Sequence, residues 1–260
     1  MTTESSLNAI LPTDADELSA VNDKSVAENR MRRRVVLASI LGNGLEWFDF
    51  VSYGYFASII AKVFFPGGGD LALMLTYATF AVGFVVRPIG GIVLGAYADR
   101  YGRRSALSLL IVMMAFGTLT LGLTPSFATI GIAAPIIVVL GRVVQGISIG
   151  GEFASATALL VEHAPAHRKM TFGAFQMSSQ ALGRVLATSV GLGVLLTFPP
   201  ATIQDGAWRI PFLIGSLIGP FGFYVRYRMA ESPEFQKLME HKKDVARAPV
   251  REVLQRHWLP

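Results

Sequence analysis

Residues 35–63 read VVLASILGNGLEWFDFVSYGYFASIIAKV, a run with only three charged side chains. A helix of ~20 apolar residues crosses the hydrocarbon core of a bilayer, so this stretch predicts a membrane-spanning helix. The composition of the whole chain agrees, because 52% of its 260 residues are hydrophobic and only 16% are charged. These values exclude an ordinary soluble domain.

Five more apolar stretches follow the first one. The six predicted spans cover residues 35–63, 71–97, 106–123, 130–161, 171–198 and 210–227. Each stretch is long enough to cross a bilayer as a helix, and glycine- or proline-rich turns lie in several of the gaps between them. We therefore predict an all-α membrane protein with a six-helix transmembrane lobe over residues 30–228.

The two ends of the chain differ from this lobe. Residues 1–29 carry six acidic side chains and a single lysine, and contain no aromatic residue. This composition predicts a disordered acidic tail. Residues 229–260 are polar by comparison, and we expect them to form a cytoplasmic segment.

Lysine and arginine are unevenly distributed between the two sides of the predicted spans. With a cytoplasmic amino terminus, 18 of the 23 basic residues lie on the cytoplasmic side, including every one from Arg226 onward. Only Lys62 and Arg209 lie on the other side. The positive-inside rule then predicts a multi-pass protein of the inner (plasma) membrane with both termini cytoplasmic. The net charge of +5 follows from this topology and does not indicate nucleic-acid binding.

The first span contains two acidic residues, Glu46 and Asp49. Asn43, Glu46, Asp49 and Tyr53 recur at intervals of three or four residues, which places them on one face of a helix. A charge at a helix centre costs ~2.5–3.5 kcal/mol on insertion scales unless it faces protein or water. We therefore expect this polar stripe to face a cavity.

Two interpretations of these acids remain open. A buried carboxyl group next to an arginine can bind and release a proton, because burial and the neighbouring charge both act on its pKa. Alternatively, Glu46 and Asp49 pair with Arg87 or Arg142 as static contacts between helices. Arg142 opens a polar segment that includes Gln145, and Glu152 follows it on the same predicted helix.

Three arginines lie within the spans, at positions 87, 142 and 184. Guanidinium groups bind carboxylates through paired hydrogen bonds, so these arginines indicate an anionic substrate. The alternative is that they only neutralise the three acids of the spans, Glu46, Asp49 and Glu152. In addition, Arg184 could face the cavity together with Gln176 and Gln180, or it could be a damaging substitution.

The segment between the second and third spans reads GAYADRYGRR from Gly95 to Arg104. Asp99 falls at the carboxyl end of a helix, where the helix dipole disfavours an anion, so it should contact a cation or the amino end of another helix. A breakable contact there would form a gate. The other predicted members of this gating segment are Gly95, Arg100, Gly102, Arg103 and Arg104, with Gly102 allowing a tight turn.

Several classes of site are excluded by the sequence. The chain contains no cysteine and only four histidines, and no His-Glu-x-x-His spacing occurs. Gly150-Gly151-Glu152 lacks the Lys-Ser/Thr of a phosphate-binding loop. We therefore predict no metal, no cofactor and no enzymatic activity.

Two motifs together resemble the major facilitator superfamily. They are Gly95-x-x-Ala98-Asp99-Arg100-x-Gly102-Arg103-Arg104 and Arg142-x-x-Gln145-Gly146-x-x-x-Gly150. Within that superfamily, residues 42–50, 87–91, 150–152, 208–212 and 231–235 are similar to the metabolite:proton symporters. Residues 60–66, 72–76 and 94–97 look most like citrate/tricarballylate-proton symporters.

The resemblance implies a twelve-helix transporter with two lobes, alternating access and a cavity in which proton movement drives uptake of a carboxylate. The chain stops near where a seventh helix would begin, so the expectation is the amino-terminal half of such a symporter. Its partners would be a small anionic substrate, a proton, the lipid bilayer and a missing carboxyl-terminal lobe or second chain. The alternative is a truncated, non-transporting membrane fragment. The proton-coupling or substrate candidates are Asn43, Glu46, Asp49, Tyr53, Arg87, Arg142, Gln145, Glu152 and Gln180.

Overall fold

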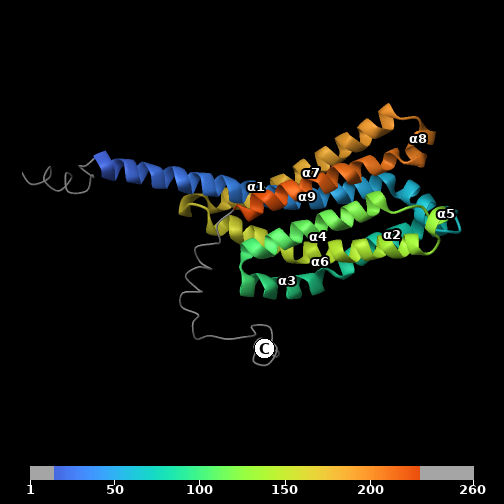
Figure 1. Ribbon diagram of the computed structural model, residues 1–260, viewed down its shortest axis with the longest axis horizontal. Helices are drawn as coiled ribbons and strands as arrows, with labels where there is room; N and C mark the ends of the chain where they lie inside the picture. The colour runs from blue at the N-terminus through green and yellow to red at the C-terminus, as the bar shows by residue number, and fades with distance from the viewer. Residues whose placement is uncertain (1–14, 229–260) are drawn as a thin grey trace, which may run out of the picture.

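The computed structural model describes residues 15–228, which form a bundle of helices without a strand in that range (Figure 1). The helices are α1 (Ala15–Phe64), α2 (Gly69–Val85), α3 (Arg87–Tyr101), α4 (Arg103–Leu123), α5 (Phe127–Ile130), α6 (Ala133–Glu162), α7 (Lys169–Thr197), α8 (Pro200–Asp205) and α9 (Ile210–Tyr227). Two 3₁₀ turns, η1 (Ala166–Arg168) and η2 (Ala207–Arg209), precede α7 and α9. The predicted all-α class is confirmed. The predicted segment 229–260 lies outside the described residues.

Six helical stretches are long and apolar enough to cross a membrane. They are Asn29–Phe64, Gly69–Tyr101, Arg103–Leu123, Ala133–Glu162, Ala166–Thr197 and Ala207–Tyr227, and they correspond to the six predicted spans. The second span consists of α2 and α3, which are separated at Val86, two residues before Pro88. Proline lacks a backbone N–H and disfavours a regular helix at this point.

The amino-terminal helix is longer than predicted. Helix α1 begins at Ala15, so residues 15–29 are helical where a disordered tail was expected. This stretch contains three alanines together with Glu, Leu and Lys, all of which are strong helix formers. A helix already formed in the membrane also extends easily, because the costly first turn has been made. Figure 1 shows this part of α1 projecting beyond the body of the bundle.

Small residues bring α6 against the second span. A Cβ atom on Gly146 would lie 2.2 Å from the carbonyl oxygen of Gly83, and one on Gly150 would lie 2.0 Å from that of Arg87. The two backbones are therefore in contact, as expected for helices that associate in lipid by close packing. This contact brings Arg87 of α3 and Arg142 of α6 toward the same part of α1.

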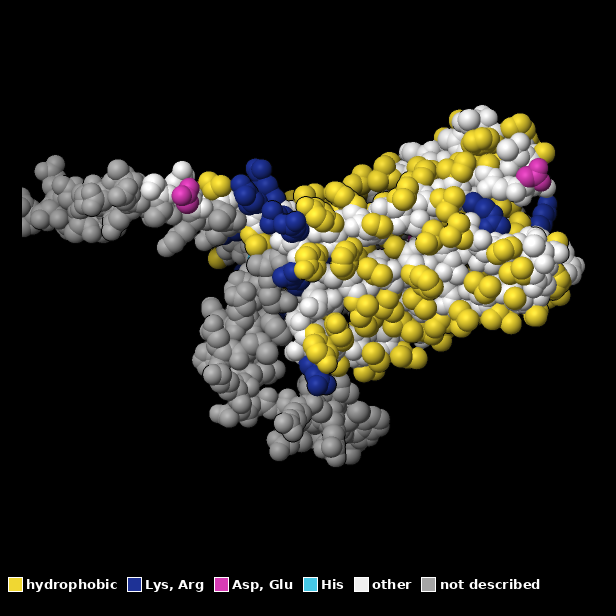
Figure 2. All heavy atoms as spheres, in the orientation of Figure 1, with side chains coloured by type: hydrophobic (Ala, Val, Ile, Leu, Met, Phe, Trp, Pro, Cys, Tyr) yellow, Lys and Arg dark blue, Asp and Glu magenta, His cyan; other side chains and the backbone are white. Residues whose placement is uncertain are grey.

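Basic residues gather at one end of the bundle. Arg34 of α1 donates a hydrogen bond to the carbonyl oxygen of Arg228 at 3.2 Å, and Arg103 of α4 pairs with Glu162 of α6. Figure 2 shows hydrophobic side chains over the middle of the visible face, with lysine and arginine concentrated where α1 enters the body. The distribution is that of a membrane-spanning bundle with one basic end.

Candidate functional site

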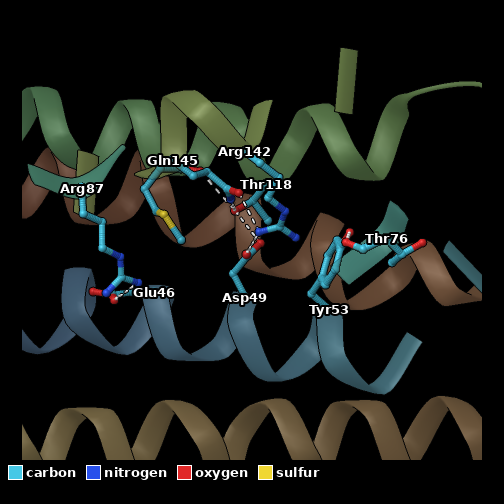
Figure 3. A network of polar contacts seen from close by, with 9 residues as sticks. Glu46, Asp49, Tyr53, Thr76, Arg87, Thr118, Arg142 and Gln145 are labelled. Carbon is cyan, nitrogen blue, oxygen red and sulfur yellow. Dashed lines mark hydrogen bonds and ion pairs between the residues drawn. The ribbon is translucent and has the colours of Figure 1, made fainter. Parts of the chain in front are cut away.

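Two acidic residues of α1 lie inside the bundle, one helical turn apart, and each contacts an arginine from a different helix (Figure 3). Glu46 is 6% exposed and Asp49 is completely buried. Their arginine partners are Arg87 of α3 and Arg142 of α6. The sequence predicted both acids and both arginines, and the structure brings them together as two separate ion pairs.

Asp49 is held by residues from two further helices. Its Oδ2 atom accepts a hydrogen bond from Nη1 of Arg142, and its Oδ1 atom lies 3.0 Å from the hydroxyl of Thr118 on α4. Gln145 completes the ring: its Oε1 accepts from Arg142 Nη1 at 2.7 Å, and its Nε2 donates to Thr118 Oγ1 at 2.9 Å. Asp49 is therefore held at both oxygens by groups that can change partner.

The guanidinium of Arg142 is not fully satisfied. Although Arg142 is almost entirely buried, neither its Nε nor its Nη2 atom has a hydrogen-bond partner. The group lies over the ring of Tyr53, 4.1 Å from the ring centroid. Buried donors without a partner are uncommon and often mark a functional group or an unseen ligand. Arg142 thus has donors available for another acceptor.

Tyr53 borders the hydrogen-bonded network of Asp49, Arg142, Gln145 and Thr118. Its hydroxyl donates to the carbonyl oxygen of Thr76 at 2.9 Å, and its ring stacks on Phe80 of α2 with 5.2 Å between centroids. Since Tyr53 and Asp49 are both completely buried, this part of the predicted polar stripe lies in the closed interior of the bundle. This part of the stripe does not face a cavity because Asp49 contacts α4 and α6 and Tyr53 contacts α2.

The second ion pair borders a cavity. Arg87 Nη2 lies 3.2 Å from Glu46 Oε1, and the Arg87 side chain is 27% exposed. Its guanidinium lies 4.2 Å from the ring centroid of Phe84 and 5.0 Å from that of Phe50. The adjoining cavity has a volume of about 440 Å³. It is lined by Asn43, Glu46, Trp47, Phe84, Arg87, Pro88, Gly91, Ile149, Gly150, Phe153 and Gln180.

Asn43 and Gln180 line the same cavity from α1 and α7. The Asn43 amide donates to the carbonyl oxygen of Gln176 and to the Ser179 hydroxyl, both at 2.7 Å. The side-chain amide of Gln176 is itself buried without a hydrogen-bond partner. Asn43 therefore fixes α1 against α7, while the amides of α7 supply further polar groups near the cavity.

Glu152 lies elsewhere and has a partner that the sequence analysis missed. Its Oε1 atom accepts from Nη2 of Arg226 at 2.5 Å, and Arg226 is completely buried. Arg226 was counted among the cytoplasmic basic residues, and nothing in the hydropathy of its helix indicated a buried acidic partner. The three acids are therefore not neutralised by the three predicted arginines, since Arg226 pairs with Glu152 in place of Arg184.

Glycine makes room for this pair. A Cβ atom on Gly42 of α1 would lie 1.8 Å from Glu152 Oε1 and 1.9 Å from Arg226 Nη2. Gly42 is the sequence signal that could have pointed to a close approach at this level of α1. Thr118, which also contacts a buried acid and was not predicted, gives no such signal, because a threonine inside an apolar helix is common.

The predicted gating segment is compact. Asp99 and Arg100 are exposed on the last turn of α3, and only Gly102, at a φ of 94°, separates α3 from α4. Arg103 pairs with Glu162, and Arg104 donates to the carbonyl oxygen of Tyr227 and lies over its ring. Within residues 15–228, the side chain of Asp99 makes no hydrogen bond or ion pair. The expected contact of Asp99 is therefore not found in that range.

The chain resembles known transporters in sequence. Residues 35–257 match the family model described as sugar (and other) transporter. A citrate-proton symporter from Klebsiella pneumoniae is 42% identical over 207 residues, which are 79% of this chain and 47% of the relative. A proline/betaine transporter from Salmonella typhimurium (strain LT2) is 35% identical over 247 residues, 92% of this chain and 49% of the relative. The chain spans about half the length of these curated relatives.

The fold is also that of a solved transporter. The xylose transporter XylE from E. coli, in a partially occluded inward-open conformation, superimposes with a TM-score of 0.73 at 20% sequence identity. The match covers 82% of this chain and 51% of XylE. A second XylE structure, a proton:xylose symporter with 6-bromo-6-deoxy-D-glucose bound, gives a TM-score of 0.72. At this level of identity, these matches establish the fold.

Proposed function

We propose that this chain, which belongs to the sugar (and other) transporter family of the major facilitator superfamily, is part of a proton-coupled symporter. It forms the amino-terminal lobe, and the substrate is a small anionic metabolite. The substrate is a di- or tricarboxylate such as citrate, and transport proceeds by alternating access of a cavity to the two sides of the membrane. The observation that carries the proposal is the buried Asp49–Arg142 pair, which leaves two donors of Arg142 without a partner.

In the proposed mechanism, protonation of Asp49 is linked to anion binding at Arg142. A proton on Asp49 removes the negative charge that faces Arg142, and a protonated carboxyl group accepts fewer hydrogen bonds from it. Arg142 then has one N–H of Nη1, as well as Nε and Nη2, available for a substrate carboxylate, while Nη1 still donates to Gln145. Proton binding therefore favours anion binding at Arg142, and by linkage anion binding favours protonation.

The Glu46–Arg87 pair provides the accessible part of the site. It borders the cavity, and Arg87 is partly exposed, so its guanidinium can meet an entering carboxylate. The Asp49–Arg142 pair lies one helical turn farther along α1 in the closed interior (Figure 3). Movement of the lobe would be needed to expose it, as alternating access requires.

The choice of a carboxylate rests on shared chemistry. Citrate, proline and betaine, the compounds in the names of the relatives, all carry a carboxylate group. The relative from Klebsiella pneumoniae supports a substrate with several such groups. Arg87 on the lining of the cavity and Arg142 at the next turn of α1 also favour a substrate with more than one carboxylate.

The basic end of the bundle gives the proposed transporter its orientation in the membrane and its gate. The basic end of the bundle lies on the cytoplasmic side of the inner membrane, with both termini there. Exposed Asp99, which lacks a partner within residues 15–228, would contact a second lobe at this end and act as a gate.

Uptake measurements test the proposal. The chain is fused to the carboxyl-terminal half of the Klebsiella pneumoniae citrate-proton symporter, and accumulation of labelled citrate driven by a pH gradient is measured in proteoliposomes. Asp49→Asn and Glu46→Gln should reduce accumulation at least tenfold in a fusion that remains folded. Absence of uptake of citrate and other di- and tricarboxylates would contradict the proposal. Undiminished accumulation in the two variants would show that the acids serve only as contacts between helices.

A further inference from the structure

Arg184 is the intramembrane arginine that has no acidic partner in the described part of the chain. It is exposed on α7, and its guanidinium lies over the ring of Trp47 on α1, 3.8 Å from the ring centroid. Trp47 lines the same cavity as Glu46, Arg87 and Gln180. Gln180 precedes Arg184 by one helical turn on α7. Arg184 therefore lies at the edge of this cavity.

The surroundings of Arg184 argue against a purely structural role for its side chain. A guanidinium within a membrane span is costly unless it faces protein or water, and the Arg184 side chain forms no ion pair that would compensate. An arginine facing lipid would be expected to reach for the membrane surface, whereas the Arg184 guanidinium lies over the ring of Trp47, which borders the cavity. Its position is therefore suited to a cavity that fills with water and solute.

Stacking on Trp47 also orients the hydrogen-bond donors. A guanidinium that stacks on an aromatic ring uses its flat face, so the N–H groups around its edge stay available for a carboxylate. Holding the planar group in place also reduces the ordering that anion binding would otherwise require. Arg87, on the other side of the cavity, is arranged in the same way over Phe84.

We propose that Arg184, held on Trp47 and flanked by Gln180, forms an anion subsite of this cavity that binds one carboxylate of a substrate while Arg87 binds another. This inference rests on the proposed carboxylate symport and adds a specificity determinant to it. A substrate with two or more carboxylates engages both arginines, whereas a monocarboxylate engages one.

The same contact rejects a competing substrate class. The face of a tryptophan ring binds quaternary ammonium groups through cation–π attraction. In this chain the guanidinium of Arg184 occupies that face of Trp47 and repels a second cation. A betaine-like zwitterion therefore meets a positive charge where an uncovered indole would bind it. Arg184 thus selects for polycarboxylates and against quaternary ammonium compounds.

Equilibrium binding tests the subsite. Labelled citrate and labelled glycine betaine are titrated against the 260-residue chain in lipid nanodiscs, and against the fusion used for uptake. Arg184→Gln should weaken citrate binding by roughly tenfold or more, the effect of losing one charged hydrogen-bonding group, and should strengthen glycine betaine binding. Arg184→Lys should lie between, because it keeps the charge but loses the flat, forked donor.

The matched control is Arg209→Gln. Arg209 also lies over a tryptophan, 4.7 Å from the ring centroid of Trp208, but it does not line this cavity. That variant should leave the affinity for citrate within twofold of the unchanged chain, and thermal unfolding should confirm that each variant folds. If Arg184→Gln and Arg184→Lys both keep full citrate affinity and gain no betaine binding, the subsite is wrong and the symport proposal survives. If the unchanged chain and fusion bind no polycarboxylate, both proposals fail.

Discussion

Two buried ion pairs of this bundle join the same kinds of side chain but differ in how completely they are satisfied. In the Glu152–Arg226 pair, every guanidinium nitrogen of Arg226 has an acceptor. Nη1 donates to the carbonyl oxygen of Leu107, Nε and Nη2 donate to that of Ala38, and Nη2 also reaches Glu152. In the Asp49–Arg142 pair, two of the three arginine nitrogens have no partner.

The difference separates a fixed contact from one that can exchange partners. Backbone carbonyls cannot be protonated, so Arg226 keeps its acceptors whatever the state of Glu152. Arg142 depends on Asp49 and on the side chains of Gln145 and Thr118, whose hydrogen bonds can rearrange. A fully bonded buried pair is costly to break, whereas a partly bonded one leaves donors for another acceptor. We therefore expect mutations at the first pair to act on stability and those at the second to act on transport.

The largest effect on stability is expected from Arg226→Met. This change leaves the Glu152 carboxylate buried without its cation, which should lower the free energy of unfolding by roughly 3–5 kcal/mol. Unfolding of the purified chain in mixed micelles, followed by circular dichroism, measures it.

A double variant sharpens this test. Arg226→Met combined with Glu152→Leu removes both charges, so it should recover at least half of the loss, because the penalty arises from the unpaired charge. A double variant as unstable as Arg226→Met alone would contradict this explanation.

Gly42→Ala should have the next largest effect. The added methyl group would overlap both partners of the Glu152–Arg226 pair and force them apart, which should cost roughly 2–3 kcal/mol of unfolding free energy. Gly54→Ala, in the same helix, is the matched control because no atom lies within 4 Å of its Cβ position. If the two variants unfold alike in a micelle titration, the close fit around Gly42 has no energetic importance.

Asp49→Asn tests the Asp49–Arg142 pair. Asparagine keeps the shape, and its single oxygen can still accept from Arg142. Its NH2 group can donate to the Thr118 hydroxyl, which has the carbonyl oxygen of Met114 as another acceptor, so the free energy of unfolding should fall by only about 1–2 kcal/mol. In the uptake fusion, however, accumulation against a gradient should be lost while citrate exchange without a gradient continues, because the amide cannot carry a proton. Loss of exchange together with accumulation would indicate a structural role for Asp49.

The sequence was sufficient for the spans because lipid imposes a simple rule. A backbone in hydrocarbon must form its own hydrogen bonds, so long apolar stretches become helices, and α9 begins and ends where hydropathy predicted. Residues 15–29 were missed because a polar composition does not exclude a helix that continues from a membrane span.

The individual acids and arginines of the site could also be predicted, because a charge within an apolar helix is conspicuous. Their pairing could not, since it depends on which helices meet at each turn of α1. Arg226 shows the limit most clearly: its burial depends on the space at Gly42 and on carbonyl oxygens of α1 and α4. Neither feature is local to α9, so the burial of Arg226 could not be predicted from its own helix.

Arg87→Lys at the border of the cavity should have the smallest effect on stability. Because Arg87 is partly exposed, the contribution of its pair with Glu46 is limited by solvent, and the variant should lower the unfolding free energy by about 1 kcal/mol or less. Its effect should appear in binding instead. Lysine keeps the charge but neither stacks flat on Phe84 nor offers a forked pair of donors, so citrate affinity should fall several-fold. Unfolding and citrate titrations on one preparation separate the two effects. A stability loss as large as that of Arg226→Met would place Arg87 among the fixed contacts and leave Asp49–Arg142 as the exchangeable pair.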